Sequence, residues 1–346
     1  MNKITLAVVA TALIISMQTV RADVKPMITV YELQKEITAK NITLESIYCK
    51  VNLVAAEGST SQFEGKFLAQ AENEAYAINI DESGDAATVT FTVPTGSNTA
   101  FSGEFTLAVA SGTTVTVNGT SGTVNVSGTK GASIKIVTSN GKVTAENCDG
   151  TLDITTKSGT ITSTNITGTF TTDSSTGAQT HTNTSGTLSY ETNEGALIVT
   201  QASGTISGTT IAGTQTYSNI EGTLNVKGST GAVKISNATG VFNIKTNSAS
   251  VNLFETKGEF HIETTKGPIV GNKGITLTAS SDYTTTEGKI QIKFTNTLDE
   301  LTFALTSDNS SATMIAKGTN KKKKLNLGKG PIVVTGHTTT GGQVYQ

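Results

Sequence analysis

Residues 150–168 read G-T-L-D-I-T-T-K-S-G-T-I-T-S-T-N-I-T-G, two nine-residue units that each open on a glycine. The same spacing runs from residue 141 to residue 267, and Ala249 fills the one position that lacks a glycine. In most units apolar side chains stand two and four places after the glycine, as Leu152 and Ile154 do. This alternation has the period of a β-strand, so each unit predicts one short strand with glycine at the bend.

Stacked coils suit such units, because every strand then gains two neighbours and all units share one core. We therefore predict an all-β fold, a single-stranded parallel β-solenoid of the right-handed β-helix or β-roll kind, with irregular β caps at both ends. The glycines at 103, 112, 122, 131 and 141 are spaced alternately nine and ten residues apart. An extra residue in every second unit favours two short strands and 18–19 residues per coil over a three-sided coil of 27.

Residues 1–22 have the layout of a secretory signal peptide, with Lys3, an apolar run over 4–15 and the small-x-small site Val20-Arg21-Ala22. We expect the mature chain to be exported to the periplasm, the cell surface or the medium. No later segment has the roughly 18 uninterrupted apolar residues of a membrane helix, so no transmembrane segment is predicted in the mature chain. The predicted domains are 23–100, an N-terminal β region and cap; 101–275, the regular nine-residue-repeat solenoid; and 276–346, the C-terminal strands and cap.

Charge is sparse in this chain, with 25 basic and 27 acidic residues and a net charge of -2. Threonine is abundant, and the one arginine, Arg21, lies in the predicted leader. A mature chain without a guanidinium group is poorly suited to reading guanine or clamping phosphate, so no nucleic-acid partner is expected. For Cys49 and Cys148 we expect two small buried thiols, with a disulfide as the alternative in an exported protein.

The repeats lack the motifs of metal binding and catalysis. Calcium-binding β-rolls place Asp in their turns, whereas these turns carry mainly Thr, Ser, Lys and Asn. His181, His261 and His337 share no ligand spacing, so we expect no metal and no cofactor. Asp153 and Asp173 are interpreted as surface carboxylates rather than as a glycosidase pair, and the protein is not expected to be an enzyme.

Two further features leave alternatives open. His181 and Gln179 fall on the inward register of the predicted strands, as Gln215 and Tyr217 do two coils later. They indicate a hydrogen-bonded polar core, or alternatively a small internal binding cavity. The lysines of residues 321–324 indicate a solvated loop, or alternatively a docking patch for an anionic partner.

The outward register of one predicted sheet carries two columns of small hydroxylated side chains. The columns would repeat about every 4.8 Å between coils and about every 7 Å along a strand. Threonine is ordinary on an exposed strand, so a plain solvated surface is the alternative. We hypothesise a recognition face whose members are Thr162, Thr164, Thr180, Thr182, Thr200, Thr216 and Ser218, with Ile198 completing the first column.

Several segments of the chain together are similar to one known family. The tract T-V-T-F-T-V-P at 88–94, the repeated x-G-T-[V/L/I]-x-[V/I]-x units and the later E-G-K-I-Q-I and G-P-I-V-V-T segments resemble the bacterial "putative adhesin" family of secreted right-handed β-helices. The resemblance spans about residues 40–346. It implies an exported, non-enzymatic cell-envelope protein and brings no catalytic motif. This chain departs from the family in its tighter nine-residue spacing and its higher threonine content.

These observations lead to one main hypothesis and two alternatives for function. The main hypothesis is an exported cell-envelope or cell-surface β-solenoid, an adhesin or interaction protein that binds a protein or glycan surface through extended Thr-rich faces. The first alternative is a self-associating structural protein of a filament or surface layer. The second is an ice-binding protein.

Overall fold

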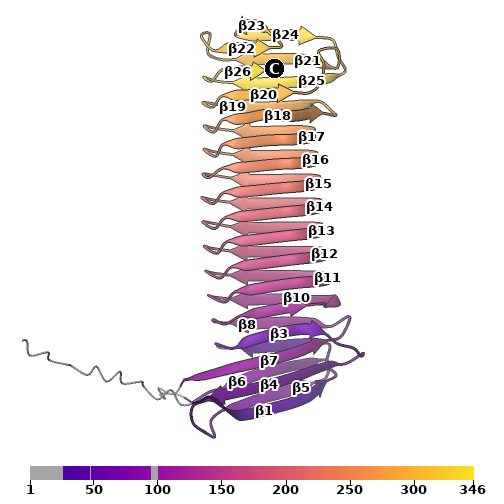
Figure 1. The fold of residues 1–346 in the computed structure, drawn as a ribbon, viewed down its shortest axis with the longest axis vertical. Helices are drawn as coiled ribbons and strands as arrows, with labels where there is room; N and C mark the ends of the chain where they lie inside the picture. The colour runs from indigo at the N-terminus through magenta and orange to yellow at the C-terminus, as the bar shows by residue number, and fades with distance from the viewer. Residues whose placement is uncertain (1–25, 47, 95–99) are drawn as a thin grey trace, which may run out of the picture.

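The computed structural model describes residues 26–46, 48–94 and 100–346, and its strands wind into a tall column (Figure 1). The 26 strands of this described part are joined by hydrogen bonds into one continuous system. Within these ranges there is no helix long and apolar enough to cross a membrane. The predicted signal peptide, residues 1–22, lies outside the described residues and stays a prediction.

The middle of the column consists of seven long strands of equal length, one for every coil. Each pairs in parallel with the next at an 18-residue offset, so that Val143 lies beside Ile161. The coil before them is one residue longer, since Val124 pairs with Val143. These offsets confirm the predicted two-sided solenoid and its coil length of 18–19 residues. The strands are β11 (Val143–Thr156), β12 (Ile161–Ser174), β13 (Gln179–Thr192), β14 (Leu197–Thr210), β15 (Gln215–Gly228), β16 (Val233–Thr246) and β17 (Val251–Thr264).

Each of these strands bends once, at a residue with left-handed backbone conformation. In β11 and β12 the bend is at Asn147 and Asn165, both with φ of 56°. Asparagine tolerates this conformation better than most residues, and here the amides also form a ladder in which Asn165 Nδ2 donates to Asn147 Oδ1 at 2.7 Å. The corner runs from this residue to the predicted glycine three places later, as from Asn147 to Gly150 with φ of 134°, so the prediction of glycine at the bend is confirmed here. The later bends are at Asn183, Gln201, Asn219, Asn237 and Glu255.

The bend divides every coil between two sheets. We call the residues before it, 143–146 in β11 and their equivalents, the first sheet. The residues after it, 150–156 in β11 and their equivalents, form the second sheet.

Glycine is required where successive coils touch through their backbones. A Cβ on Gly204 would lie 2.2 Å from the carbonyl oxygen of Gly186 one coil below, and φ there is 107°. At the other corner, a Cβ on Gly195 would lie 2.1 Å from the carbonyl oxygen of Gly177. A buried hydroxyl fixes the same corner, because Thr192 Oγ1 accepts a hydrogen bond from the Gly195 N–H at 3.1 Å. Glycines nine residues apart thus fall alternately into two columns, one at each corner, and within each column successive coils touch through their backbones.

The core is a narrow stack of apolar side chains between the two sheets. The rings of Phe242 and Phe260 stack with their centroids 4.8 Å apart. Burying a side chain of this size stabilises the fold by about 1.5–3 kcal/mol. The prediction that residues two and four places after glycine face inward is confirmed. One column, in which each member is at most 1% exposed, consists of Phe170, Leu188, Ile206, Leu224, Phe242 and Phe260.

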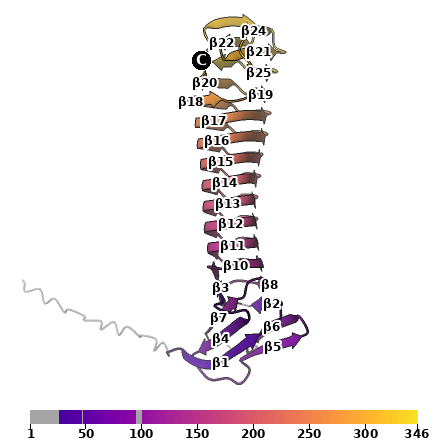
Figure 2. The ribbon, with the colours of Figure 1, turned by 90° about the vertical axis from the view of Figure 1, so that its right-hand side faces the viewer.

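Ten strands precede the regular coils, and there the column broadens (Figure 2). They are β1 (Ile28–Ile37), β2 (Asn41–Ser46), β3 (Lys50–Ala55), β4 (Ser61–Ala69), β5 (Ala77–Ser83), β6 (Ala86–Thr92), β7 (Phe101–Val109), β8 (Thr114–Gly119), β9 (Val124–Ser127) and β10 (Lys130–Thr138). The first sheet continues through β9, β3, β7 and β4 to β1. The second continues through β10, β8, β2 and β6 to β5. Both outermost pairings are antiparallel, which confirms an irregular β cap.

Nine strands follow the regular coils: β18 (Ile269–Leu277), β19 (Ser281–Thr285), β20 (Ile290–Phe294), β21 (Leu301–Ser307), β22 (Thr313–Ala316), β23 (Thr319–Lys322), β24 (Lys324–Gly328), β25 (Ile332–Thr338) and β26 (Gln343–Tyr345). The first sheet ends in β23, antiparallel to β22, and the second ends in β24, antiparallel to β21. The lysines of residues 321–324 are exposed, but they lie in β23, in β24 and at the corner between them. The prediction of a loop there was wrong, because β23 folds back on β22 as a hairpin and β24 pairs with β21, which makes this segment extended.

Candidate functional site

The predicted recognition face lies on the first sheet of four consecutive coils, β12 to β15. The backbone register places its members in two straight columns with one residue of each column per coil. The seven predicted side chains are all half-buried, because each lies between neighbours of its own column. The first column is Thr162, Thr180, Ile198 and Thr216, and the second is Thr164, Thr182, Thr200 and Ser218.

This face carries no charged residue over those four coils, and charged residues mark its limits. Glu146 on β11 continues the second column toward the N-terminal end. Lys234 on β16 continues the first column toward the other end. Ile198 is the one large apolar side chain among the eight and is 41% exposed. The face therefore presents rows of methyl and hydroxyl groups to a partner.

The second sheet carries another threonine column, which the sequence analysis did not single out. The signal is the dipeptide Gly-Thr that opens every second unit, and its threonines lie in lateral register. The outward column four places further along these strands is charged, since it includes Asp173, Glu191 and Lys227. Charge thus distinguishes the two sheets. The threonines of the additional column are Thr151, Thr169, Thr187, Thr205 and Thr223.

The interior of the middle coils is polar around His181, which is fully buried. Its Nδ1 lies 2.8 Å from Ser163 Oγ and its Nε2 lies 3.1 Å from Gln179 Oε1. Its ring stacks on Tyr190 with the centroids 4.0 Å apart. Burial lowers the pKa of His181 from 6.5 to about 3, so the imidazole stays neutral near pH 7. The prediction of a hydrogen-bonded polar core is confirmed.

The glutamine beside this histidine belongs to an arrangement that occurs three times. Gln215 Nε2 donates to Thr210 Oγ1 at 3.0 Å, and its Oε1 accepts from the Tyr217 hydroxyl at 2.6 Å. Room for this tyrosine comes from Gly208, where a Cβ would lie 1.6 Å from the hydroxyl oxygen. The polar groups satisfy one another, so they hold the core together rather than await a ligand. The other two sets are Ser174, Gln179 and His181, and Thr338, Gln343 and Tyr345.

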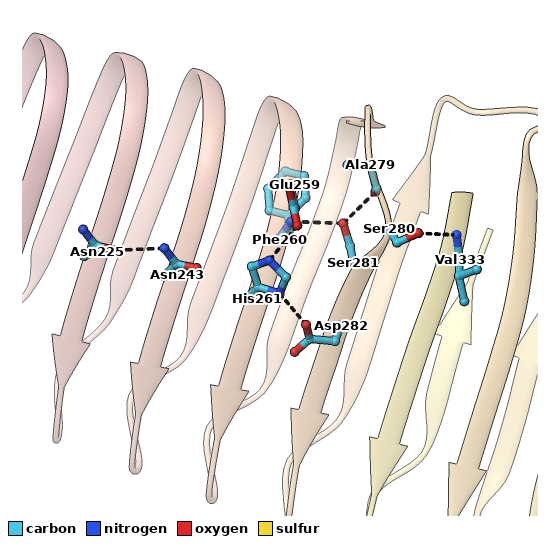
Figure 3. Close-up of polar contacts among 10 residues, drawn as sticks. All are labelled: Asn225, Asn243, Glu259, Phe260, His261, Ala279, Ser280, Ser281, Asp282 and Val333. Atoms are coloured by element: carbon cyan, nitrogen blue, oxygen red, sulfur yellow. Dashed lines mark hydrogen bonds and ion pairs between the residues drawn. The ribbon is translucent and has the colours of Figure 1, made fainter. Parts of the chain in front are cut away.

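A cluster of ionisable side chains lies on the second sheet, where the regular coils end (Figure 3). His261 on β17 bonds through Nδ1 to Asp282 on β19 and through Nε2 to Glu259 at 2.8 Å. The hydrogen bond to Asp282 raises the pKa of His261, and the bond to Glu259 adds to it against partial desolvation. Sequence reasoning missed this cluster because Asp282 lies 21 positions after His261, outside the 18-residue period.

A shallow hollow adjoins this cluster on the same sheet. Lys245 Nζ lies 2.9 Å from Glu263 Oε2, and Asn243 Nδ2 donates to Asn225 Oδ1 at 2.9 Å. The carboxylates of the hollow are thus paired with lysine or imidazole. In the described part of the chain, no group of three or more His, Cys, Asp or Glu side chains is arranged to hold a metal ion.

The two cysteines are both buried, and no disulfide joins Cys49 to Cys148. Cys148 Sγ donates to the backbone oxygen of Glu146 at 3.3 Å. The expectation of two buried thiols is confirmed.

Comparison with known proteins identifies similar solved structures but no family. No protein-family model and no curated protein sequence matches this chain. A structure described as a "putative cell adhesion protein" from Clostridium sporogenes is similar at 11% identity and a TM-score of 0.22, covering 91% of this chain and 98% of that chain. A "putative adhesin" from Bacteroides fragilis is similar at 7% identity and a TM-score of 0.22, covering 91% of this chain and 97% of that chain. Both descriptions agree with the family that the repeat pattern resembles, and at these TM-scores the likeness carries no argument about function.

Proposed function

We propose that this chain is an exported, non-enzymatic adhesion or interaction protein of the cell envelope that binds a protein or glycan surface. The observation that carries the proposal is the uncharged face of eight side chains in two columns on β12 to β15. Every strand of the face is hydrogen-bonded on both sides, which makes the face rigid. A rigid face loses little conformational entropy on binding, so weak contacts repeated along it add up.

A neutral partner suits this face best. Its hydroxyl groups can exchange hydrogen bonds with sugar hydroxyls or backbone amides, while its methyl groups contact apolar surface. Three intervals between four stacked strands make the face about 14 Å long, the length of a few sugar rings or of a short peptide strand. The predicted leader supports export, because a signal peptide would bring this face outside the cytoplasm.

The test is a charge placed in the centre of the face. Thr180→Lys with Thr182→Lys should abolish binding of the purified protein to immobilised neutral polysaccharides or to intact cells, measured by surface plasmon resonance and by cell attachment. The matched control, Thr187→Lys with Ser189→Lys, places the same charges on the second sheet of the same strand and should retain binding. Equal binding by both folded variants would refute the proposal.

The same regular array supports ice binding as a second candidate. Hydroxyl and methyl groups repeat at nearly constant spacing in two dimensions, about 4.8 Å by about 7 Å. Thermal hysteresis of a concentrated solution measures this activity directly. A freezing point equal to the melting point would exclude ice binding and leave the adhesion proposal intact.

A further inference from the structure

In the part of the chain that the structure describes, both sheets of the column end, at both ends, in a strand with one free edge. At the N-terminal end β1 pairs with β4 and β5 pairs with β6, and the described residues give neither strand a second ladder. At the C-terminal end the same holds for β23 on β22 and β24 on β21. Figure 1 shows β1 and β23 at opposite ends of the column. Free edges of this kind are templates for the addition of another strand.

Charge separates along the axis of the molecule. Residues 26–94 contain ten carboxylates and four lysines, whereas residues 296–346 contain six lysines and three carboxylates. The intervening residues 100–295 are nearly balanced, with thirteen carboxylates and twelve lysines. One end of the column is therefore negative and the other positive.

At the C-terminal end the charge lies on the terminal strands themselves. Lys321 and Lys322 close β23, Lys323 forms the corner with φ of 71°, and Lys324 opens β24. All four side chains are exposed, and the ion pairs of the described residues include none of them.

At the N-terminal end exposed carboxylates lie on the terminal strands and on the loop that leads into β5. Glu32 and Glu36 are on β1 and Asp81 is on β5. Glu72 and Glu74 lie in the preceding loop. The two ends therefore carry opposite charge beside their free edges.

A second copy of this chain is the partner that fits these edges. Lysines on an edge strand repel the same edge of another copy, which disfavours contact between two C-terminal ends. Contact between opposite ends brings positive charge to negative charge. It also brings β23 to β1, which both belong to the first sheet, and β24 to β5, which both belong to the second.

We propose that copies of this chain associate head to tail, with β23 and β24 of one copy on β1 and β5 of the next. Such a contact joins two different surfaces and does not close on itself, so it propagates into a filament. The two sheets would continue from copy to copy, and the uncharged face on β12 to β15 would stay accessible along the side. The inference goes beyond the proposed adhesive function and does not depend on it.

The experiment is sedimentation velocity of the purified mature chain over a concentration series at two salt concentrations. The Debye length is about 30 Å at 0.01 M and about 3 Å at 1 M ionic strength, so attraction between the ends is screened only in the second. We expect dimers and longer species at low salt and an association constant at least tenfold smaller at high salt. A monomer at every concentration in low salt would overturn the proposal.

Charge reversal tests which surfaces meet. Replacing Lys321 to Lys324 by Glu should abolish association, and so should the separate variant Glu32→Lys with Glu36→Lys and Asp81→Lys. An equimolar mixture of the two variants should associate again, because the glutamates on β23 and β24 of one variant then meet the lysines that replace the carboxylates of β1 and β5 in the other. Restored association also shows that neither variant failed through misfolding, and a mixture that stays monomeric would refute the pairing of ends.

Replacing the lysines by neutral residues tests whether they attract the acidic end of another copy or only keep the edge strand from pairing. If the lysines only keep the edge unpaired, changing all four to Thr should strengthen association, which would overturn the proposal. If they attract the acidic end, the same variant should associate at least tenfold more weakly. Thr180→Lys with Thr182→Lys serves as the control, because it should leave association unchanged. Loss of association in that control would assign the contact to the lateral face instead.

Discussion

The buried histidine predicts a loss of stability in mild acid. His181 is neutral in the folded protein, with its pKa lowered to about 3 by burial, whereas in the unfolded chain it takes up a proton near pH 6.5. Protons therefore favour the unfolded state throughout this interval, and the free energy of unfolding falls as the pH falls below 6.5. For this one residue the loss is about 1 kcal/mol at pH 5.5 and about 3 kcal/mol at pH 4.5.

Other titrating groups act outside this window or in the opposite direction. Glu82 and Glu104 have lowered pKa values, so the stability they contribute is lost only as the pH falls through their folded pKa, below about 4.5. The pKa of His261 is raised, so its contribution is complete below the unfolded pKa and is lost as the pH rises. Between pH 6.5 and pH 5 the downward slope therefore belongs to His181.

The assay is urea denaturation followed by circular dichroism between pH 7.5 and pH 4.5, for the wild type and for His181→Leu. Leucine suits the site, because Leu253 occupies the same inward column in β17. The variant should be less stable at pH 7.5 by about 1–3 kcal/mol, since Ser163 and Gln179 lose a partner, but its stability should change little down to pH 5. Equal slopes for the two proteins, or an imidazole that titrates near pH 6.5 by NMR in the folded wild type, would refute the reasoning.

Three more outcomes are expected. Gly204→Ala should destabilise the protein by about 2 kcal/mol or more, because the new Cβ would lie 2.2 Å from a carbonyl oxygen at a φ of 107°. Ala249→Gly, the control, should cost under about 1 kcal/mol. Thermal unfolding that ranks the two variants the other way would contradict the requirement for glycine where the coils touch. Tyr217→Phe should cost about 1–3 kcal/mol in urea denaturation, since a buried glutamine oxygen loses its donor, and an unchanged midpoint would argue against this core arrangement. Asp282→Asn should lower the pKa of His261 in an NMR titration, because its first hydrogen-bond partner loses its charge; an unchanged pKa would show that the pair does not form in solution.

Much of the regular solenoid could be predicted because its information is local and repeated. The alternation around Leu152 and Ile154 specifies which side chains face inward, and the 18-residue offset then fixes the lateral neighbours of Thr180. The two columns of the candidate face were therefore placed in the correct register. The left-handed conformation of Asn147 was not predicted, although asparagine recurs there at 18-residue intervals, because the glycine three places later is the stronger signal for the same corner.

The features missed from the sequence arise where the period fails. His261 meets Asp282 across an irregular coil that is longer than those of the repeat, so no fixed offset pairs them. The lysines of residues 321–324 look like a solvated loop in isolation. They become strands because β23 forms a hairpin with β22 and β24 pairs with β21, which adds an antiparallel strand to the end of each sheet.

The amino-acid sequence by itself determined the length of a coil, the side of the strand on which each residue lies and the absence of charge from the candidate face, because these follow from nearest-neighbour stacking of a repeated unit. Tertiary structure alone decided where that stacking stops. The free strands β1, β5, β23 and β24, with opposite charge beside them, are defined by the antiparallel pairings that end the two sheets, which are local hairpins for β5 and β23 and longer-range pairings for β1 and β24. Such pairings depend on the whole fold, since a strand becomes an edge only when no other segment lies beside it.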